Sequence, residues 1–317
     1  MEVARSTVTP SELPRIPAPW RLPAETGSTA RVTAAHMTDP VCPWAYSFEP
    51  AMRALESRYG DQLEMRTVVI GLVSDADQLV ARGYSPERGA LTALAFRRLG
   101  MPFALNVRER PIASAPACRL VKAVTLQGDE FGEAILRALR LALFNTPLLL
   151  DEVDSLEALC STIDGLDVAG AIGDLESPSV EDAYQADREE ARTPSEIAVT
   201  LNRSANSDGR DRYTAPSLVL TSSDGSTSVV PGFQPFEAID VAIMNLEPKL
   251  RRLPVPELEE LLGLYPGGLT SQEIARVLAD TTAPPDRPAA ETALTHLLAT
   301  GRARRTPIGD DALWTSA

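Results

Sequence analysis

Apolar and polar residues follow two different periods along this chain. The stretch ARVTAAHM, 30–37, is a short β-like run, and LEMRTVVIG, 63–71, reads as a strand that ends in glycine. Between them Phe48, Met52 and Leu55 recur at helical spacing. This strand–helix–strand order predicts two parallel strands that are joined by a right-handed crossover.

A long helical stretch follows. Residues 75–205 contain successive segments with leucine or alanine at every third or fourth position, which predicts an all-helical insertion. The polar run SANSDGRDR, 204–212, predicts a loop. Beyond it, two short apolar runs flank Asp224-Gly225, which is a strong hairpin signal, and residues 235–246 have the pattern of a helix.

The pattern changes once more near the end of the chain. Residues 255–317 contain three helical stripes and then two short strands around Gly309-Asp310. This order of elements resembles that of a winged helix. We therefore expect a small winged-helix-like module at this position.

Four parts make up the predicted organisation. Residues 1–29 are rich in Pro, Ser and Thr and have no apolar signal-like region, so we expect a disordered leader. An α/β domain occupies 30–74 and 206–250. The helical insertion at 75–205 interrupts this domain, and the module at 255–317 follows it.

Composition excludes several classes of function. The chain has 317 residues, 44% of them hydrophobic, and a formal net charge of -14, so it repels phosphate backbones and nucleic acid is an unlikely partner. No run of about 18 apolar residues occurs, so we expect no membrane span. Without an export signal we expect a cytoplasmic location with reduced thiols. The chain has only 2 histidines and no ligand spacing typical of a metal site, so we expect no metal.

One cysteine has a setting that suggests chemistry. Cys42 directly precedes Pro43 and Trp44 in MTDPVCPWAYSFEP, at the predicted start of a helix. Free N–H groups at a helix start favour the thiolate, so we expect a thiol pKa below the ordinary value of ~8.5. Further on, Ala215-Pro216 opens a strand, and a cis peptide bond opposite the cysteine would account for a proline at this place.

Two separated segments carry a family resemblance. TDPVCPWAYSFEP resembles the active-site segment of the DsbA-like branch of the thioredoxin superfamily, which usually reads Cys-Pro-Trp-Cys, and TAPSLVL resembles the cis-proline loop and strand of that family. The helical insertion also fits that family, as does Pro50, since thioredoxin-like active-site helices often carry a proline at that distance and kink there. In particular the chain resembles the cytosolic FrnE-like members and related protease adaptors, a subgroup that RPIASAPACR resembles. The resemblance covers roughly 30–246. It implies an α/β, thioredoxin-like domain in which Cys42 is the nucleophile. It also implies a substrate-binding set, namely Pro43, Trp44, Ala45, Thr214, Ala215 and Pro216.

The sequence departs from that family at Ala45. A second cysteine normally stands there and resolves the mixed disulfide. Cys42 would then need a thiol from a small molecule, from a partner protein, or from Cys118 or Cys160, unless Ala45 is itself an engineered replacement. Cys118 and Cys160 stand among apolar residues, so we expect both to be packed in helices.

Three functions remain open. The leading hypothesis is a DsbA-like thiol–disulfide oxidoreductase with a single active-site thiol, acting on a disulfide-containing protein or a small thiol. The second is a non-enzymatic adaptor whose degenerate thioredoxin-like groove binds a protein. The third is a transferase or isomerase that depends on a low-molecular-weight thiol, as in the kappa-class glutathione transferases. We expect no tightly bound cofactor. The near-neutral C-terminal module favours docking of a protein partner over DNA contact.

Overall fold

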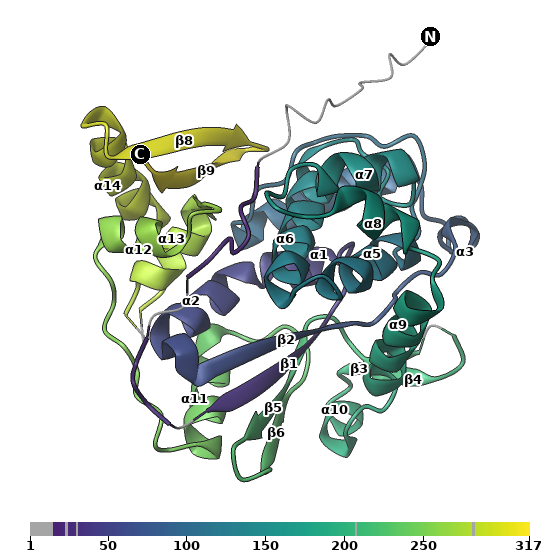
Figure 1. Ribbon diagram of the computed structural model, residues 1–317, viewed down its shortest axis with the longest axis horizontal. Helices are drawn as coiled ribbons and strands as arrows, with labels where there is room; N and C mark the ends of the chain where they lie inside the picture. The colour runs from purple at the N-terminus through teal and green to yellow at the C-terminus, as the bar shows by residue number, and fades with distance from the viewer. Residues whose placement is uncertain (1–14, 23–24, 30, 207, 281–282) are drawn as a thin grey trace.

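The computed structural model shows a mixed sheet flanked by helices, with a smaller three-stranded sheet near the C-terminus (Figure 1). The structure describes residues 15–22, 25–29, 31–206, 208–280 and 283–317.

The central sheet has the strand order β2-β1-β5-β6. β1 (Val32–Thr38) pairs in parallel with β2 (Leu63–Val69) and antiparallel with β5 (Ser217–Ser222). β5 in turn pairs antiparallel with β6 (Thr227–Val230). The predicted pair of parallel strands and the predicted hairpin are therefore confirmed. Gly225 in the hairpin turn has φ +87°, a backbone conformation that favours glycine.

The helix predicted after β1 is divided into two. α1 (Pro43–Ser47) is followed by Phe48, which is the C-cap of α1 and the N-cap of α2 (Glu49–Tyr59). Pro50 lies in the first turn of α2, where it has no N–H to donate to the carbonyl of Tyr46. The helical hydrogen bonding is interrupted at this junction, close to the proline that the family resemblance marks as a kink.

Alternate residues of β1 contribute to two cores. Val32 and Ala34 pack with α2 and α11 (Phe236–Leu246) on one face of the sheet. Ala35 and Met37 pack on the other face, together with residues of α9 (Pro178–Ala191) and α10 (Glu196–Thr200). The period of two along β1 thus places helices on both faces of the sheet.

The segment expected to be a helical insertion folds as eight α-helices, α3 to α10. Most of them enclose a core of leucine, isoleucine and alanine side chains. Their bounds are α3 (Ala76–Ala81), α4 (Pro86–Phe96), α5 (Ala115–Thr125), α6 (Asp129–Asn145), α7 (Val153–Cys160), α8 (Val168–Gly173), α9 (Pro178–Ala191) and α10 (Glu196–Thr200).

The polar loop predicted at 204–212 is wrong. β3 (Ser204–Asn206) and β4 (Asp211–Tyr213) pair antiparallel in a separate two-stranded sheet. The residues between them are polar, but Arg212 and Tyr213 are buried against the rest of the protein. Tertiary burial rather than local hydrophobicity fixes this hairpin.

The disordered leader predicted for 1–29 is also wrong over the part that the structure describes; residues 1–14 and 23–24 lie outside that part. Ile16 is fully buried, and its N–H donates to the carbonyl of Thr162 at 3.0 Å. Trp20 is 3% exposed and its carbonyl accepts from the N–H of Gly267 at 2.9 Å. These two apolar side chains hold the segment against both the insertion and the C-terminal module.

The C-terminal module has the three predicted helices and the predicted hairpin, together with one additional short strand. Its sheet has the order β7-β9-β8, and the side chain and backbone of Thr270 form a capping box with Glu273 at the start of its second helix. The elements are α12 (Leu258–Leu264), β7 (Leu269–Thr270), α13 (Ser271–Leu278), α14 (Arg287–Ala299), β8 (Ala303–Ile308) and β9 (Asp311–Ser316).

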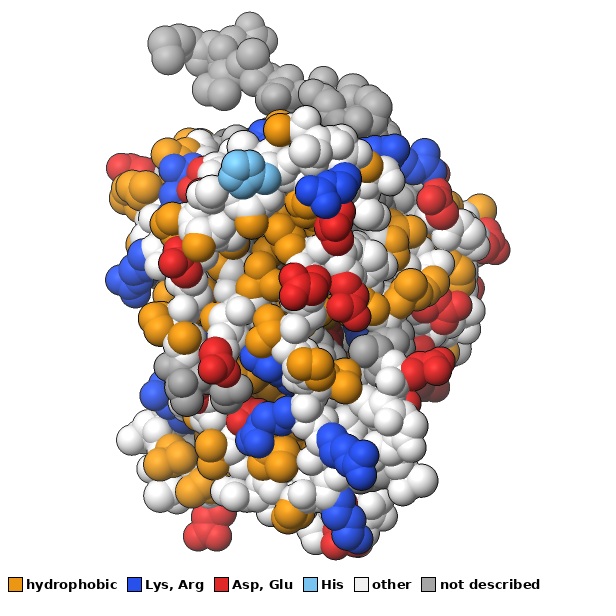
Figure 2. All heavy atoms as spheres, turned by 90° about the vertical axis from the view of Figure 1, so that its left-hand side faces the viewer, with side chains coloured by type: hydrophobic (Ala, Val, Ile, Leu, Met, Phe, Trp, Pro, Cys, Tyr) orange, Lys and Arg blue, Asp and Glu red, His pale blue; other side chains and the backbone are white. Residues whose placement is uncertain are grey.

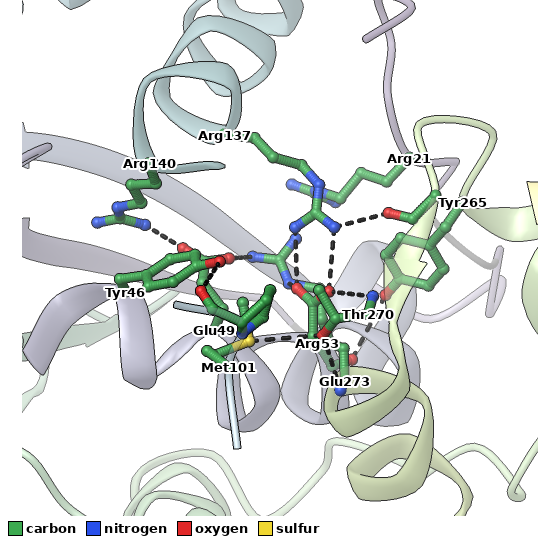
Figure 3. A network of polar contacts seen from close by, with 12 residues as sticks. Arg21, Tyr46, Glu49, Arg53, Met101, Arg137, Arg140, Tyr265, Thr270 and Glu273 are labelled. Carbon is green, nitrogen blue, oxygen red and sulfur yellow. Dashed lines mark hydrogen bonds and ion pairs between the residues drawn. The ribbon is translucent and has the colours of Figure 1, made fainter. Parts of the chain in front are cut away.

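A buried cluster of charges joins this module to the rest of the chain (Figure 3). Arg137 of α6 donates to both carboxylate oxygens of Glu273 on α13, at 2.9 and 3.0 Å. Arg53 of α2 pairs with Glu49 and Glu56 at 2.9 Å. The guanidinium groups of Arg53 and Arg137 lie over the ring of Trp20, at 4.5 and 4.4 Å. The N-terminal segment, α2, α6 and α13 therefore form one continuous interior.

The surface of the module carries no concentrated positive charge on the side that faces the viewer in Figure 2. Lysine and arginine side chains are dispersed there among acidic and apolar ones. The module itself, 255–317, has 5 Lys and Arg against 9 Asp and Glu, a net charge of -4. With the three cations that directly precede it, the count across 249–317 is 8 against 9, a net charge of -1. Weak DNA affinity stays a prediction, and this distribution of charge is consistent with it. Among the described residues, no helix is both long and apolar enough to cross a membrane.

Candidate functional site

Cys42 lies where the turn after β1 leads into α1. It is the N-cap residue of that helix, its carbonyl accepts from the N–H of Tyr46 at 3.0 Å, and Pro43 follows at the first helical position. The Cys42 thiol lies 3.4 Å from the carbonyl oxygen of Ala215, to which it donates. The Ala215–Pro216 peptide bond is cis, so the expected proline loop lies beside the cysteine.

The prediction of a low pKa for Cys42 is wrong. Burial of Cys42, and to a smaller extent the nearby carboxylate of Asp39, raise the pKa of its thiol, which reaches about 11. The N–H groups of Ala45 and Trp44 act in the opposite direction but do not compensate for the lost hydration. The thiol is 6% exposed because the sheet and the β4–β5 connection cover it, and α1 has only one full turn with which to oppose that cost.

Alkylation of Cys42 is therefore expected to show a midpoint near pH 11. Iodoacetamide reacts with the thiolate, so the rate should rise steadily as pH rises from 7 to 11. The measurement is peptide-resolved mass spectrometry after short pulses of reagent, which separates Cys42 from the other two cysteines. A midpoint at or below the ordinary value of ~8.5 would contradict the burial argument.

The structure supplies no second thiol in contact with Cys42. Ala45 is fully buried on the inner side of α1. Cys118 and Cys160 are packed in α5 and α7 with no exposed surface, as predicted, and all three cysteines are free thiols. Burial raises the pKa of Cys118 well above its ordinary value and that of Cys160 to about 12. Neither is poised to resolve a mixed disulfide formed at the surface.

Asp39 organises the turn that carries Cys42. Its carboxylate is fully buried and accepts from the N–H of Val41 at 3.0 Å and from the N–H of Leu72 at 2.8 Å. The Cys118 thiol approaches the same carboxylate at 3.6 Å. Asp39 thus caps the loop rather than the helix, and it connects this loop to the end of β2.

A groove of 480 Å³ opens next to Cys42. Val41, Cys42, Pro43 and Trp44 line one side of it. Trp44 is 42% exposed, and its ring meets that of Phe96 on α4 edge-on at 4.9 Å. The indole therefore packs against the insertion and also lines the groove, next to the cysteine where the family resemblance places it among the substrate-binding residues.

The other predicted binding residues do not line this groove. Ala45, Thr214, Ala215 and Pro216 are absent from its lining, although Ala215 touches the Cys42 thiol. The hydroxyl of Thr214 donates to the carbonyl of Arg203 at 3.1 Å. The predicted site is thus divided: the cysteine faces the proline loop on one side, and the open groove extends on the other, towards the insertion.

The far walls of the groove come mostly from residues that the sequence did not single out. They belong to α4 and to the connection from Phe103 to Arg108, and they include Phe96. Arg110, Pro111 and Ile112, which begin the RPIASAPACR segment of the family resemblance, complete this wall. One signal was present: α4 has leucines outside its core-facing stripe, in the pattern of a helix that does not bury itself fully. Among the described residues, no group of His, Cys, Asp and Glu could hold a metal ion.

Comparison with known proteins places this geometry in a family. A family model described as thioredoxin matches residues 36–202. The ClpXP adapter protein SpxH of Shouchella clausii is 30% identical over 246 residues, which are 76% of this chain and 75% of that protein. SpxH of Halalkalibacterium halodurans is 31% identical over 169 residues, 51% of this chain and 54% of that protein.

Solved structures show the same fold at lower identity. A protein of Nitrosomonas europaea described as a protein disulfide isomerase has a TM-score of 0.52 at 17% identity, over 68% of this chain and 97% of its own. A protein of Streptomyces coelicolor described as a DsbA oxidoreductase has a TM-score of 0.50 at 19% identity, over 72% and 94%. At these identities the likeness extends to the fold alone.

Proposed function

Since the chain belongs to the thioredoxin family, and since its only thiol at the active-site position is buried, we propose that it is a non-enzymatic adaptor that binds a protein partner. The thioredoxin-like domain is retained as a binding scaffold in this proposal. The adaptor function was the second of the three hypotheses from the sequence, and it now replaces the first.

The observation that carries the proposal is the combination of Ala45 with the raised pKa of Cys42. With a pKa of about 11, only about one thiol in 10,000 is ionised at pH 7, against a few per cent for an ordinary cysteine. The thiolate is the nucleophile in disulfide exchange, so attack is slow. Release of a mixed disulfide has no resolving thiol either. Both half-reactions are impaired, while the groove beside them stays open.

The relatives support the same direction. SpxH proteins carry the name of ClpXP adapters, and the first of them aligns with three quarters of this chain. We extend that role to this chain as part of the proposal: it binds a protein in the cytoplasm and brings it to ClpXP. The C-terminal module has the element order of a winged helix, and we propose that it supports the scaffold and offers a further surface for docking of a protein partner.

In the host cell, deletion of this gene is expected to lengthen the half-life of at least one protein that ClpXP degrades, as measured by proteome-wide pulse–chase. A chromosomal Cys42→Ser variant should keep the half-life of that protein at its wild-type value, because binding does not need the thiol. If no half-life changes on deletion, the adaptor proposal fails.

A monothiol oxidoreductase is the second candidate. The contact between the Cys42 thiol and the carbonyl of Ala215, next to the cis bond, favours it, because the cysteine and the proline loop keep the arrangement that the family resemblance implies. A small-molecule thiol would have to supply the second half-reaction. A Cys42→Ser variant that behaves like the deletion would support this candidate over the adaptor.

A further inference from the structure

The groove beside Cys42 has walls that nothing else in the described chain covers. α3 and α4 contain no buried residue at all. Gly89, Thr92, Ala93 and Phe96 recur at helical spacing on the side of α4 that lines the groove. Ala93 and Phe96 are only partly buried against the helical core, so α4 is incompletely packed in the isolated protein.

Apolar exposure continues beyond the groove itself. Leu91 and Leu94, on the opposite side of α4, are 58% and 50% exposed. In the connection after Phe103, Ala104 lines the groove, whereas Leu105 and Val107 are 52% and 63% exposed. A small molecule in a hollow of 480 Å³ would leave these side chains in water. An apolar surface of this extent indicates a protein partner.

The charged residues in the groove are all of one sign. Its lining contains Arg88, Arg108 and Arg110 and no carboxylate, on a chain whose net charge is -14. Arg110 is neutralised by Asp151 at 2.7 Å and by Glu152 at 3.0 Å. The guanidinium of Arg88 lies over the ring of Tyr84, which also lines the groove. Arg88 makes no ion pair with a residue that the structure describes.

Arg108 is the cation with the fewest partners. Its Nε donates to the carbonyl of Leu148 at 3.3 Å, and no carboxylate within the described ranges pairs with it. Burial lowers the pKa of Arg108 to about 10, because the guanidinium has lost much of its hydration. A partly desolvated cation without a counter-charge would gain most from a carboxylate that enters the groove.

We propose that this groove is the docking site for an acidic, apolar segment of the partner protein, with a carboxylate of that segment paired to Arg108. The inference rests on the proposed adaptor function and names the chemistry of what the adaptor binds. Apolar side chains of the segment fill the groove, which Trp44 and Phe96 help to line. An amphipathic helix presents such anchors at positions i, i+3, i+4 and i+7.

Two matched peptides test this on the full chain. One is a fluorescein-labelled amphipathic helix with leucine and phenylalanine on one face and glutamate beside them, and the other has glutamine at every glutamate. By fluorescence anisotropy the glutamate peptide should bind about tenfold more tightly than the glutamine peptide at low salt. Arg108→Gln should remove that tenfold difference and leave the glutamine peptide unchanged.

Arg98→Gln is the matched control, since Arg98 is exposed just after α4 and lies outside the groove lining. It should alter the affinity of neither peptide. Equal affinities for the two peptides, an equal effect of Arg98→Gln and Arg108→Gln, or no binding of either peptide would overturn the inference. Displacement of the glutamate peptide by glutathione at similar concentration would also overturn it and assign the groove to a small anionic thiol.

The host-cell assay separates the two proposals. If Arg108→Gln keeps the partner's half-life short while Ala93→Trp, which fills the groove, lengthens it, the adaptor function stands and the acidic occupant is wrong. If deletion of the gene changes no half-life, the adaptor function itself is wrong, whatever the peptides do.

Discussion

An Arg137→Met variant is expected to lose about 3–5 kcal/mol of stability, because it removes the bidentate partner of the buried Glu273 carboxylate and leaves only Arg53, at 4.0 Å, as a counter-charge. The side chain of Glu273 is fully buried and that of Arg137 is 3% exposed. The guanidinium also donates to the carbonyl of Gly268 at 2.7 Å and covers the ring of Trp20. One substitution therefore removes an ion pair, a hydrogen bond and a stacking contact.

The loss should be greatest at the interface that this cluster forms. Urea unfolding measures the total effect, and hydrogen exchange should show faster exchange in α13 than in the central strands. Arg210→Met is the matched control: Arg210 pairs with Glu189 at 2.6 Å, but both side chains are largely exposed. That variant should unfold at the same urea concentration as the wild type.

A second substitution checks the electrostatic cause. In Arg137→Met/Glu273→Gln the buried charge is gone, while the glutamine oxygen can still accept from the N–H of Thr270 as Glu273 does at 2.7 Å. The double variant should be more stable than Arg137→Met alone. If the two variants unfold at the same urea concentration, lost packing on Trp20 rather than the unpaired charge explains the loss of stability.

Local patterns determine much of this fold. The alternation in β1 and β2, the Asp224-Gly225 turn and the leucine stripes of 75–205 each have a period or a turn chemistry that the sequence displays directly. The cis bond at Ala215–Pro216 was expected from a proline at the opening of a strand together with the family resemblance. Such features could be predicted because the evidence for each lies within a few adjacent residues or in a family motif.

The predictions from the sequence that were wrong share a different cause. Ile16 and Trp20 have no periodic neighbours, and their partners are distant in the chain. Thr162 and Gly267 bond to their backbones, and Arg53 and Arg137 cover the ring of Trp20. Cys42 has the local signals of an acidic thiol. Its burial, however, depends on Ala191, Ala198 and Tyr213, which share with it the core on the Ala35 and Met37 face of the central sheet. Arg108 belongs to the site only because the chain folds α4 across from it. For each of these residues, parts of the chain that are distant in the sequence determine its environment.

Ala45→Cys is expected to create a dithiol that cycles, which takes insulin reduction from background to a measurable rate. Cys42 and position 45 lie one helical turn apart in α1, the spacing of the family's paired cysteines. Position 45 is fully buried, so the new sulfur points into the protein near Cys42 rather than into solvent. Diamide treatment followed by thiol counting should show one intramolecular disulfide.

The pH dependence of this variant separates the two proposed causes of inactivity, which are the missing second thiol and the raised pKa of Cys42. Insulin reduction should be slow at pH 7 and rise towards pH 9, because Cys42 keeps a raised pKa. Ala45→Ser, of similar size but without a thiol, should stay at background throughout. Failure to form the disulfide would mean that the geometry around α1 is unsuited to a dithiol. A disulfide that forms and never reduces insulin would mean that burial of Cys42 alone prevents exchange, and that restoring the missing thiol does not return the enzyme.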